Sequence, residues 1–301
     1  MASFALDLPA EAEAHKLSRT LRKLGAPRDT EAVATTLRLA AGLPASSQGN
    51  SAGSDSTLSA AERDALDALL GELDGARRRG FAEAVDCLGN RDVRRVLAAL
   101  RSFHDKPAVL PFGNRDESDA VSRALTRVAG QLFAHDGWEL ASLGGAEKEP
   151  WEQLLGVSSP RCEQIHSLRK AIREMRYAME AFEPLYDTLD AEATRHFKAQ
   201  LGALVELQTH IGTMHDVQVC IQVLADTCGG GGAGAAASLG AHVDSHGGKG
   251  KGHQAKRAFP QLTAALRARF DDAWVEFQKG RERMLSREGQ QQLYAALLGS
   301  L

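Results

Sequence analysis

A row of cationic side chains lies within one stretch of the sequence, residues 161–183. At about 100° per residue of an α-helix, the row and the tyrosine that ends it fall within one sector of roughly 120°: His166, Arg169, Lys170, Arg173, Arg176 and Tyr177. Guanidinium groups match phosphate oxygens through paired hydrogen bonds, and Lys and His add single charged donors. The spacing therefore predicts a helix face that binds an anion.

An apolar stripe runs beside this row on the same predicted helix, formed by Ile165, Leu168, Ile172, Met175 and Met179. A solvated basic face is the ordinary alternative, since surface cations usually alternate with acids at i,i+4 spacing. Within residues 166–177 only Glu174 is acidic. A cationic row beside a core-forming stripe favours an anion site at the edge of the core.

Other chemistry finds little support in the sequence. It contains no GxxxxGK[ST] loop and no GxSxG elbow, and its four cysteines lack the CxxC pattern of zinc and redox sites. His210 and His215 are spaced i,i+5, which is not a usual spacing for two metal ligands on a helix. We therefore expect binding rather than catalysis, with no cofactor and no metal.

Composition predicts an all-α protein. Aromatic residues make up 5% of the 301 residues, and helix-forming Ala, Leu, Arg and Glu dominate the periodic segments. The net charge is −3, so bulk attraction to nucleic acid or to an anionic membrane is not expected. The opening residues do not resemble a signal or transit peptide, and no apolar run approaches the roughly 20 residues of a membrane span. A cytoplasmic protein that is not secreted is expected.

The helices that must position the row can be placed along the chain. Residues 11–42 are predicted as helix, break, helix, with Gly25 and Pro27 at the break and Asp29 or Thr30 capping the second helix. A helix that opens at Ser118 or Asp119 is expected to stop at Gly137. Beyond the basic helix, Pro184 ends or kinks it, a break follows at Gly212, and Asp216 caps the next helix.

The predicted organisation has five parts. Residues 1–43 form a first helical unit, and Ser/Gly-rich residues 44–57 form a flexible linker. The main helical body covers residues 58–228. Residues 229–257, rich in Gly, Lys and His, are expected to be disordered, and residues 258–301 form a last helix interrupted near Gly289.

A weak internal repeat relates the first helical unit to the end of the main helical body. Shifting the chain by 187 positions aligns residues 24–37 with residues 211–224. The shift pairs Gly25 with Gly212, Arg28 with His215, Asp29 with Asp216, and Val33 with Cys220. If the halves are related, the first-half partner of the basic helix should begin some 21 residues before Met1. Residues 1–43 are then a remnant of the first half.

These features resemble the conserved histidine α-helical domain, the CHAD family. The string HSLRKAIREMRYAMEAF resembles the family's H-x-x-R…R/K-x-x-R-Y helix, and LGALVELQTHIGTMHDVQV is similar to its L-G-x-x-x-D junction. The resemblance extends from about Ala14 to the last helix. It implies an all-α fold of two pseudo-symmetric helical bundles around a basic groove that binds inorganic polyphosphate without catalysis, in the cytoplasm or at polyphosphate granules.

By motif position, the resemblance implies phosphate contacts from His166, Arg169, Arg173 and Arg176. Lys170 joins them by helical geometry, and approximate position adds Lys198, His215, Arg28, Arg123 and Arg127. Glu174 departs from the family pattern, which is often basic there.

The alternatives to polyphosphate binding are a helical scaffold for an acidic protein or RNA, or a truncated copy with reduced ligand binding. An unperturbed histidine titrates near pH 6.5, so phosphate at His166 would favour its charged form and binding should strengthen as pH falls.

Overall fold

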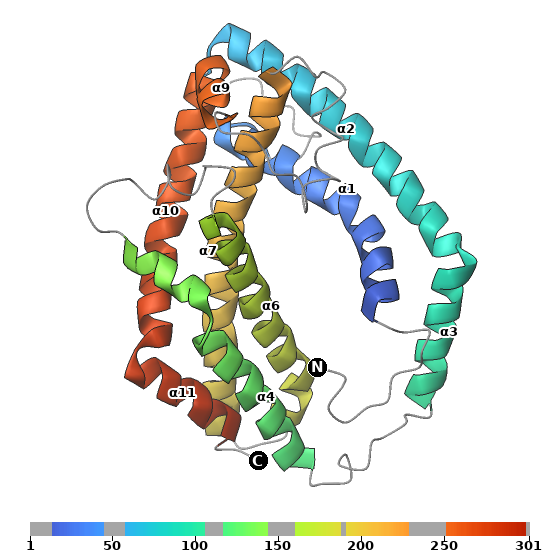
Figure 1. Cartoon of the computed structure of the whole chain (residues 1–301), viewed down its shortest axis with the longest axis vertical. Coiled ribbons are helices and arrows are strands. Elements are labelled where there is room, and N and C mark those ends of the chain that lie inside the picture. The colour runs from blue at the N-terminus through green and yellow to red at the C-terminus, as the bar shows by residue number, and fades with distance from the viewer. Residues whose placement is uncertain are drawn as a thin grey trace.

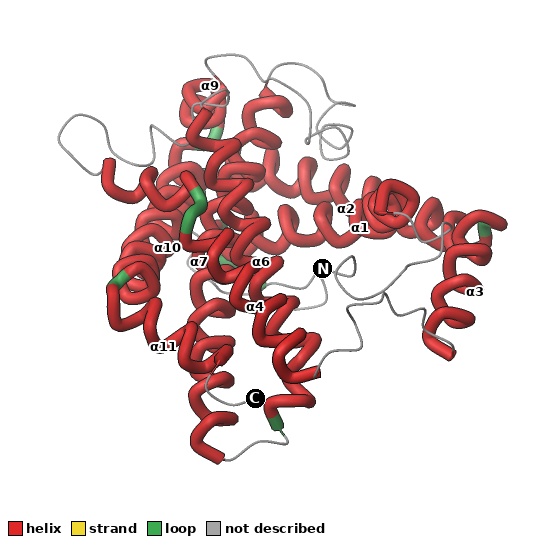
Figure 2. The backbone as a smooth tube through the Cα atoms, turned by 60° about the horizontal axis from the view of Figure 1, so that its bottom comes forward, coloured by secondary structure: helices red, strands yellow, loops and turns green. Residues whose placement is uncertain are grey.

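The computed structural model describes residues 14–44, 58–105, 117–143, 160–187, 191–228 and 251–298. Within these segments the chain is helical and no strand occurs (Figure 2). The predicted all-α class is therefore confirmed. The predicted linker 44–57 lies mostly outside the described residues, as do residues 229–250 of the predicted disordered insertion.

The helices follow one another along the chain in this order: α1 (Ala14–Ala40), α2 (Ala60–Gly89), α3 (Arg91–Asp105), α4 (Glu117–Phe133), the 3₁₀ helix η4 (Asp136–Leu143), α6 (Pro160–Tyr186), α7 (Ala191–Cys228), α9 (Lys251–Ala258), α10 (Pro260–Leu285) and α11 (Arg287–Leu298). Figure 1 shows them in one assembly, with α7 near its centre and α2 and α3 along one side.

The core forms around α7, which packs against α1, α6, α9, α10 and α11. Its buried residues include Leu204, Leu207, Ile211, Met214, Val217 and Ile221. A helix that is apolar on several sides is one that other helices surround. At its N-terminal end, the rings of Phe197 and Tyr186 stack with centroids 3.8 Å apart, and both side chains are fully buried. The helix carrying the cationic row therefore docks on the most buried helix.

Helix α1 runs without a break through Gly25 and Pro27, so the predicted break is wrong. A proline inside a helix removes one main-chain hydrogen bond and usually bends the helix. Figure 1 shows α1 bent along its length. Packing on α2 supports this conformation, because Gly80 lies so close to Pro27 that an added Cβ would be 3.5 Å from the proline Cγ. Asp29 consequently lies inside α1 and is not the predicted cap.

The C-terminal end of α1 is fixed by a glycine with a positive φ of 72° at Gly42. Its N–H donates to the carbonyl oxygen of Leu39 at 3.2 Å, and the N–H of Leu43 donates to that of Arg38 at 2.8 Å. This pair of bonds is the Schellman arrangement, in which glycine avoids the cost of the left-handed conformation. The chain is thereby turned out of the helix at the residue where the sequence predicted its end.

Helix α7 also continues through Gly212, so the break predicted there is wrong. A glycine within a helix costs about 1 kcal/mol relative to alanine. The burial of Ile211 and Met214 on the adjoining turns outweighs that cost. Asp216 therefore lies in the interior of α7 and is not a cap.

The N-termini of α2 and α10 meet at Glu62, which is 4% exposed. Ser59 and Glu62 form a capping box, in which the side chain of each accepts from the main-chain N–H of the other. The second carboxylate oxygen accepts from the N–H groups of Gln261 and Leu262 at 2.8 and 3.3 Å. One buried carboxylate thus caps two helices that are far apart in the sequence.

Helix α4 ends at Phe133, before the predicted stop at Gly137, and η4 follows. The N–H of Gly137 donates to His135 Nδ1 at 2.9 Å, which leaves Nε2 to carry the proton. His135 Nε2 lies 3.0 Å from Ser167 Oγ on α6 and donates to it. A Cβ at Gly137 would lie 2.7 Å from Leu168 Cβ. The glycine therefore permits the close approach of η4 to α6.

The C-terminal segment differs slightly from its prediction. The interruption expected near Gly289 occurs at Ser286, between α10 and α11. Within the insertion predicted as disordered, Lys251–Ala258 instead forms helix α9, which packs on α7 and buries Ala255. Pro184 lies inside the last turn of α6, which ends at Tyr186.

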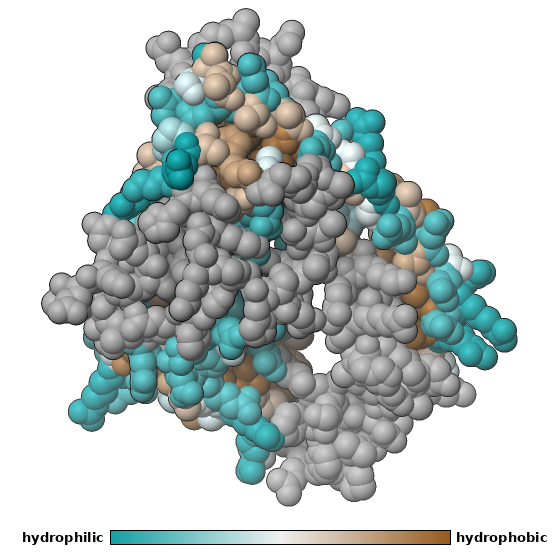
Figure 3. All heavy atoms as spheres, turned by 45° about the horizontal axis from the view of Figure 1, so that its top comes forward, coloured by the Kyte–Doolittle hydropathy of each residue, from teal (hydrophilic) through white to brown (hydrophobic). Residues whose placement is uncertain are grey.

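One face of the molecule is mainly polar where its residues are described. Figure 3 shows hydrophilic residues over much of the coloured surface of one face, with apolar residues in smaller areas between them. Three exposed apolar side chains lie on α2, where Phe81, Val85 and Leu88 are 64%, 51% and 49% exposed. Among the described residues, none of the helices is both long and apolar enough to cross a membrane.

Candidate anion-binding site

Two edges of α6 have different neighbours. Ser167 lies on the edge that contacts α4 and η4, through its bond to His135. On the opposite edge, the ring of His166 lies 5.4 Å from the ring of His215 on α7, with 38° between the ring planes. Most of the predicted cations lie on this second edge, which therefore faces α7.

Arg169 follows His166 by one turn and is half-buried. Burial lowers the pKa of its guanidinium, and the charges of Arg173 and Arg28 lower that pKa further, whereas the carboxylates of Asp216 and Asp29 raise it. Charges separated by more than about 10 Å are largely screened in salt solution. Residues of α1, α6 and α7 therefore meet in one neighbourhood around Arg169.

We call this group the three-helix cluster. It consists of Arg28 and Asp29 from α1, His166, Arg169 and Arg173 from α6, and His215 and Asp216 from α7. His215 Nδ1 lies 3.9 Å from Asp216 Oδ1, which ties the histidine pair to the rest. Arg28, Asp29 and Arg173 are exposed, whereas Arg169, Asp216 and both histidines are half-buried. A ligand arriving from solvent would meet two guanidiniums and one carboxylate first and the half-buried groups behind them.

The sequence reasoning missed Asp29 and Asp216 as site residues, because it interpreted both as helix caps. Burial raises the pKa of each carboxyl group, and the guanidiniums of Arg28 and Arg169 offset only part of that rise. The negative charge of Asp29 also raises the pKa of Asp216. The signal was present in the 187-residue shift, which pairs these two acids with each other.

The α7-facing edge of α6 changes sign along its length. Beyond the cluster, Arg176 Nε lies 3.3 Å from Glu180 Oε1, and the Arg176 guanidinium lies 4.6 Å from the centre of the Tyr177 ring. The next residues on this edge are the acids Glu183 and Asp187. Arg176 therefore stands at the boundary between a basic and an acidic half of the helix.

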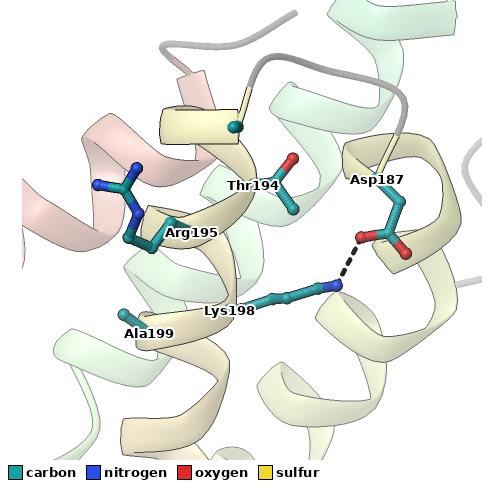
Figure 4. Close-up of a pocket in the computed structure, with 6 residues that line it drawn as sticks. Asp187, Thr194, Arg195, Lys198 and Ala199 are labelled. Carbon is teal, nitrogen blue, oxygen red and sulfur yellow. Dashed lines mark ion pairs between the residues drawn. The ribbon is translucent and has the colours of Figure 1, made fainter.

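Lys198 lies in the acidic half. Its Nζ is 2.8 Å from Asp187 Oδ1 and 3.8 Å from Glu183 Oε1. Figure 4 shows Lys198 reaching across from α7 to Asp187 in a pocket that is also lined by Thr194 and Arg195. The side chain is already neutralised by two carboxylates, in surroundings unlike those of the three-helix cluster.

Lys170 and Glu174 lie on the outward side of α6, and both are exposed. They are spaced i,i+4, so their charges are neighbours on the helix surface. At about 100° per residue, Glu174 is turned away from the α7-facing edge that carries Arg169 and Arg173. The acid therefore does not interrupt the cationic row on that edge.

Arg123 and Arg127 are exposed on α4. This helix packs against the edge of α6 that lies away from α7. The structure therefore separates these two arginines from the three-helix cluster, while it brings Arg28 and His215 into it. Within the described residues, no group of three or more His, Cys, Asp or Glu side chains is arranged to hold a metal ion.

Comparison with known proteins gives one match. A family model described as the CHAD domain matches residues 2–225, which include α1, the basic helix α6 and nearly all of α7. No curated protein and no solved structure matched the chain. The match ends before α9, so the C-terminal helices lie outside it although they pack on α7. Because the match covers well over half of the sequence, the chain belongs to the CHAD domain family.

Proposed function

We propose that the chain binds inorganic polyphosphate at the three-helix cluster without catalysis, and thereby associates with polyphosphate bodies. The observation that carries the proposal is the convergence of three arginines from two helices, Arg28, Arg169 and Arg173, beside the His166 and His215 pair. The CHAD domain is a family often associated with polyphosphate binding and generally acts as a non-catalytic binding domain.

The electrostatics of Arg169 support an anion as the missing partner. Its guanidinium is partly removed from water and is repelled by Arg28 and Arg173, and both effects lower its pKa. A phosphate would accept paired hydrogen bonds from guanidinium groups and would relieve this repulsion. Polyphosphate repeats that charge along a chain, so one ligand can engage cations of α1 and α6 together.

Asp29 and Asp216 have a part in the same proposal. In the absence of ligand they partly neutralise Arg169, which keeps three guanidiniums close together without large repulsion. The acids also reduce the net attraction for a polyanion. They therefore set the affinity, which should be stronger when either carboxylate is neutral.

Binding can be tested by calorimetry with long-chain inorganic polyphosphate at low salt. We expect the double variant Arg169→Ala, Arg173→Ala to weaken binding by at least roughly tenfold, since each charge-assisted contact contributes about 1 kcal/mol or more. The control Arg78→Ala, Arg267→Ala removes the same charge from exposed sites that pair with Asp74 and Asp271. Equal losses in the two double variants, or no binding by the unmodified protein, would refute the proposal.

A helical scaffold for an acidic protein or RNA remains the second candidate, since it too would use polyanion contacts. Salt dependence does not separate these ligands, because every polyanion releases counterions. Competition does separate them. Two displacement experiments are compared at equal concentrations of phosphate groups. We expect polyphosphate to displace labelled RNA at a lower concentration than RNA requires to displace labelled polyphosphate. The reverse order would favour the scaffold.

A further inference from the structure

Helix α7 carries a strip of residues that faces away from the core. At about 100° per residue the strip falls within one sector of roughly 100°, and its members are exposed or half-buried: Val205, Thr209, Gly212, Thr213 and Asp216. Cys220 continues the same line by one turn but is fully buried, because α1 crosses there and Val33 O lies 3.7 Å from the thiol. The strip therefore begins at the surface and ends beneath α1.

Arg269 lies on α10 near the buried end of this strip. Burial raises the pKa of the Cys220 thiol, the Asp216 carboxylate raises it further, and the Arg269 guanidinium lowers it. Asp216 also belongs to the three-helix cluster, where it interacts with Arg169. Cys220, one turn beyond Asp216 on α7, therefore lies within electrostatic range of both a cluster residue, Asp216, and Arg269 on α10.

The Arg269 side chain has an unsatisfied donor. Its Nε is buried, and no group in the described part of the chain accepts a hydrogen bond from it. The other arginines of α10 have carboxylate or carbonyl partners. Arg267 lies 3.5 Å from Asp271, Arg281 donates to Trp138 O at 2.9 Å, and Arg283 donates to Glu206 at 2.8 Å. Arg269 is the exception among the arginines of this helix.

A buried donor without a partner is unfavourable and is rare in folded proteins, so each case points to a structural or ligand role. Cys220, which lies near Arg269, uses its thiol hydrogen on Val33 O, and the charges that act on Asp216 come from Arg169, Asp29 and Arg28. An anion that reaches past Asp216 would supply an acceptor for Arg269. The same anion would still contact the cluster.

We propose that Arg269 is a further anion-binding residue, which holds phosphate groups of a ligand that extends from the three-helix cluster across α7 to α10. The inference rests on the proposed polyphosphate binding. It adds a contact from α10, which lies beyond the matched part of the chain, residues 2–225. It also assigns the α7 strip as the surface over which the ligand passes.

The test uses Arg269→Met in the full chain, with Arg267→Met as the matched control on the same helix. Methionine keeps an unbranched side chain but removes both the charge and the unsatisfied donor. We expect Arg269→Met to weaken polyphosphate binding roughly tenfold, as for loss of one charge-assisted contact. The slope of log affinity against log salt should fall by about one. Arg267→Met should change affinity less than about twofold, because its pair is exposed.

Thermal melting distinguishes binding from a structural role. Removal of an unsatisfied buried donor should leave the melting temperature of Arg269→Met unchanged or higher while affinity falls. A lower melting temperature with unchanged affinity would assign Arg269 a structural role and overturn the inference. If the unmodified protein binds but both methionine variants bind equally well, the inference fails and the proposed function stands. If the unmodified protein does not bind, the proposed function fails and the inference fails with it.

Discussion

The thiol of Cys220 on α7 donates a hydrogen bond to the main-chain carbonyl oxygen of Val33 on α1, with 3.7 Å between sulfur and oxygen. The two residues are 187 positions apart, which is the shift that aligns the two predicted repeats. A contact between equivalent residues is expected where related elements cross at a two-fold axis. Asp29 and Asp216, separated by the same shift, also influence each other. Both relationships support the hypothesis of an internal repeat.

Asp216→Asn should strengthen polyphosphate binding by roughly three- to tenfold at neutral pH, since it removes one negative charge a few ångströms from the ligand in a partly solvated site. Calorimetry on the variant and on Asp226→Asn, an acid further along α7, tests this expectation. A gain of the same size in both variants would show that net charge, and not the cluster, controls affinity.

The same carboxyl groups predict a pH dependence. Burial raises the pKa of Asp29 and Asp216 above the ordinary 3.8. As pH falls, these carboxyl groups take up protons in the folded protein at a higher pH than in the unfolded chain. At neutral pH their charged forms therefore lower the free energy of unfolding, and acidification restores it. Polyanion affinity should rise over the same interval.

When the pH is lowered from 7 to 4.5, polyphosphate affinity should therefore rise less steeply in the double variant Asp29→Asn, Asp216→Asn than in the unmodified protein. A rise that remains in the double variant would come from groups other than these two carboxyls. Identical pH profiles for the two proteins would exclude the carboxyl groups as its source.

Lys198→Ala should change polyphosphate affinity less than about twofold, because exposed ion pairs contribute little and Lys198 is already paired with Asp187 and Glu183. Arg173→Ala removes the same charge from the cluster and should weaken binding several times more. The comparison tests whether the change of sign along α6 marks the end of the site. Equal losses would extend the site to the acidic half.

Gly137→Ala should destabilise the fold by roughly 1–3 kcal/mol, as expected for overpacking. The added Cβ would lie 2.7 Å from Leu168 Cβ and 3.0 Å from the carbonyl oxygen of Gln164. Urea denaturation measures the change. Gly71→Ala on α2 is the control, since its Cβ would have no atom within 4 Å and should stabilise the helix by up to about 1 kcal/mol.

Glu62→Ala should lower the free energy of unfolding by roughly 2–4 kcal/mol, because hydrogen bonds to a buried charge are lost at two helix N-termini. Its carboxylate accepts from Ser59 and from the N–H groups of Gln261 and Leu262. Glu72→Ala, an exposed site on the same helix, should change stability by no more than about 0.5 kcal/mol. A loss at position 62 as small as this would contradict the double-cap interpretation.

Periodicity alone gave the helical class and part of the helix layout, as the basic helix α6 and the start of α4 at Glu117 show. Local signals failed where tertiary packing opposed them. Gly25, Pro27 and Gly212 are unfavourable inside isolated helices, yet α1 and α7 pass through them because packing against neighbouring helices outweighs the local cost. The acids beside these residues then lie in helix interiors, where a capping role is not available.

The cationic row was predictable because it lies within one helix, where spacing fixes direction. The partners of the row were harder to predict, since they depend on how helices dock. No sequence pattern within α7 shows that Lys198 forms an ion pair with an acid that follows α6, or that the ring of His215 contacts that of His166. Nor does spacing show that Arg123 and Arg127 lie on a helix packed against the other edge of α6.

The basic half of the α6 edge has a fixed length. Residues 166–176 span about 15 Å at 1.5 Å per residue, and acids follow immediately. A long polyphosphate chain exceeds that span many times over, so each protein molecule would occupy one short segment and leave the rest available. The number of protein molecules bound per polyphosphate chain should then grow in proportion to chain length, while the affinity for each segment stays constant. A single polymer would therefore bind many copies of this protein.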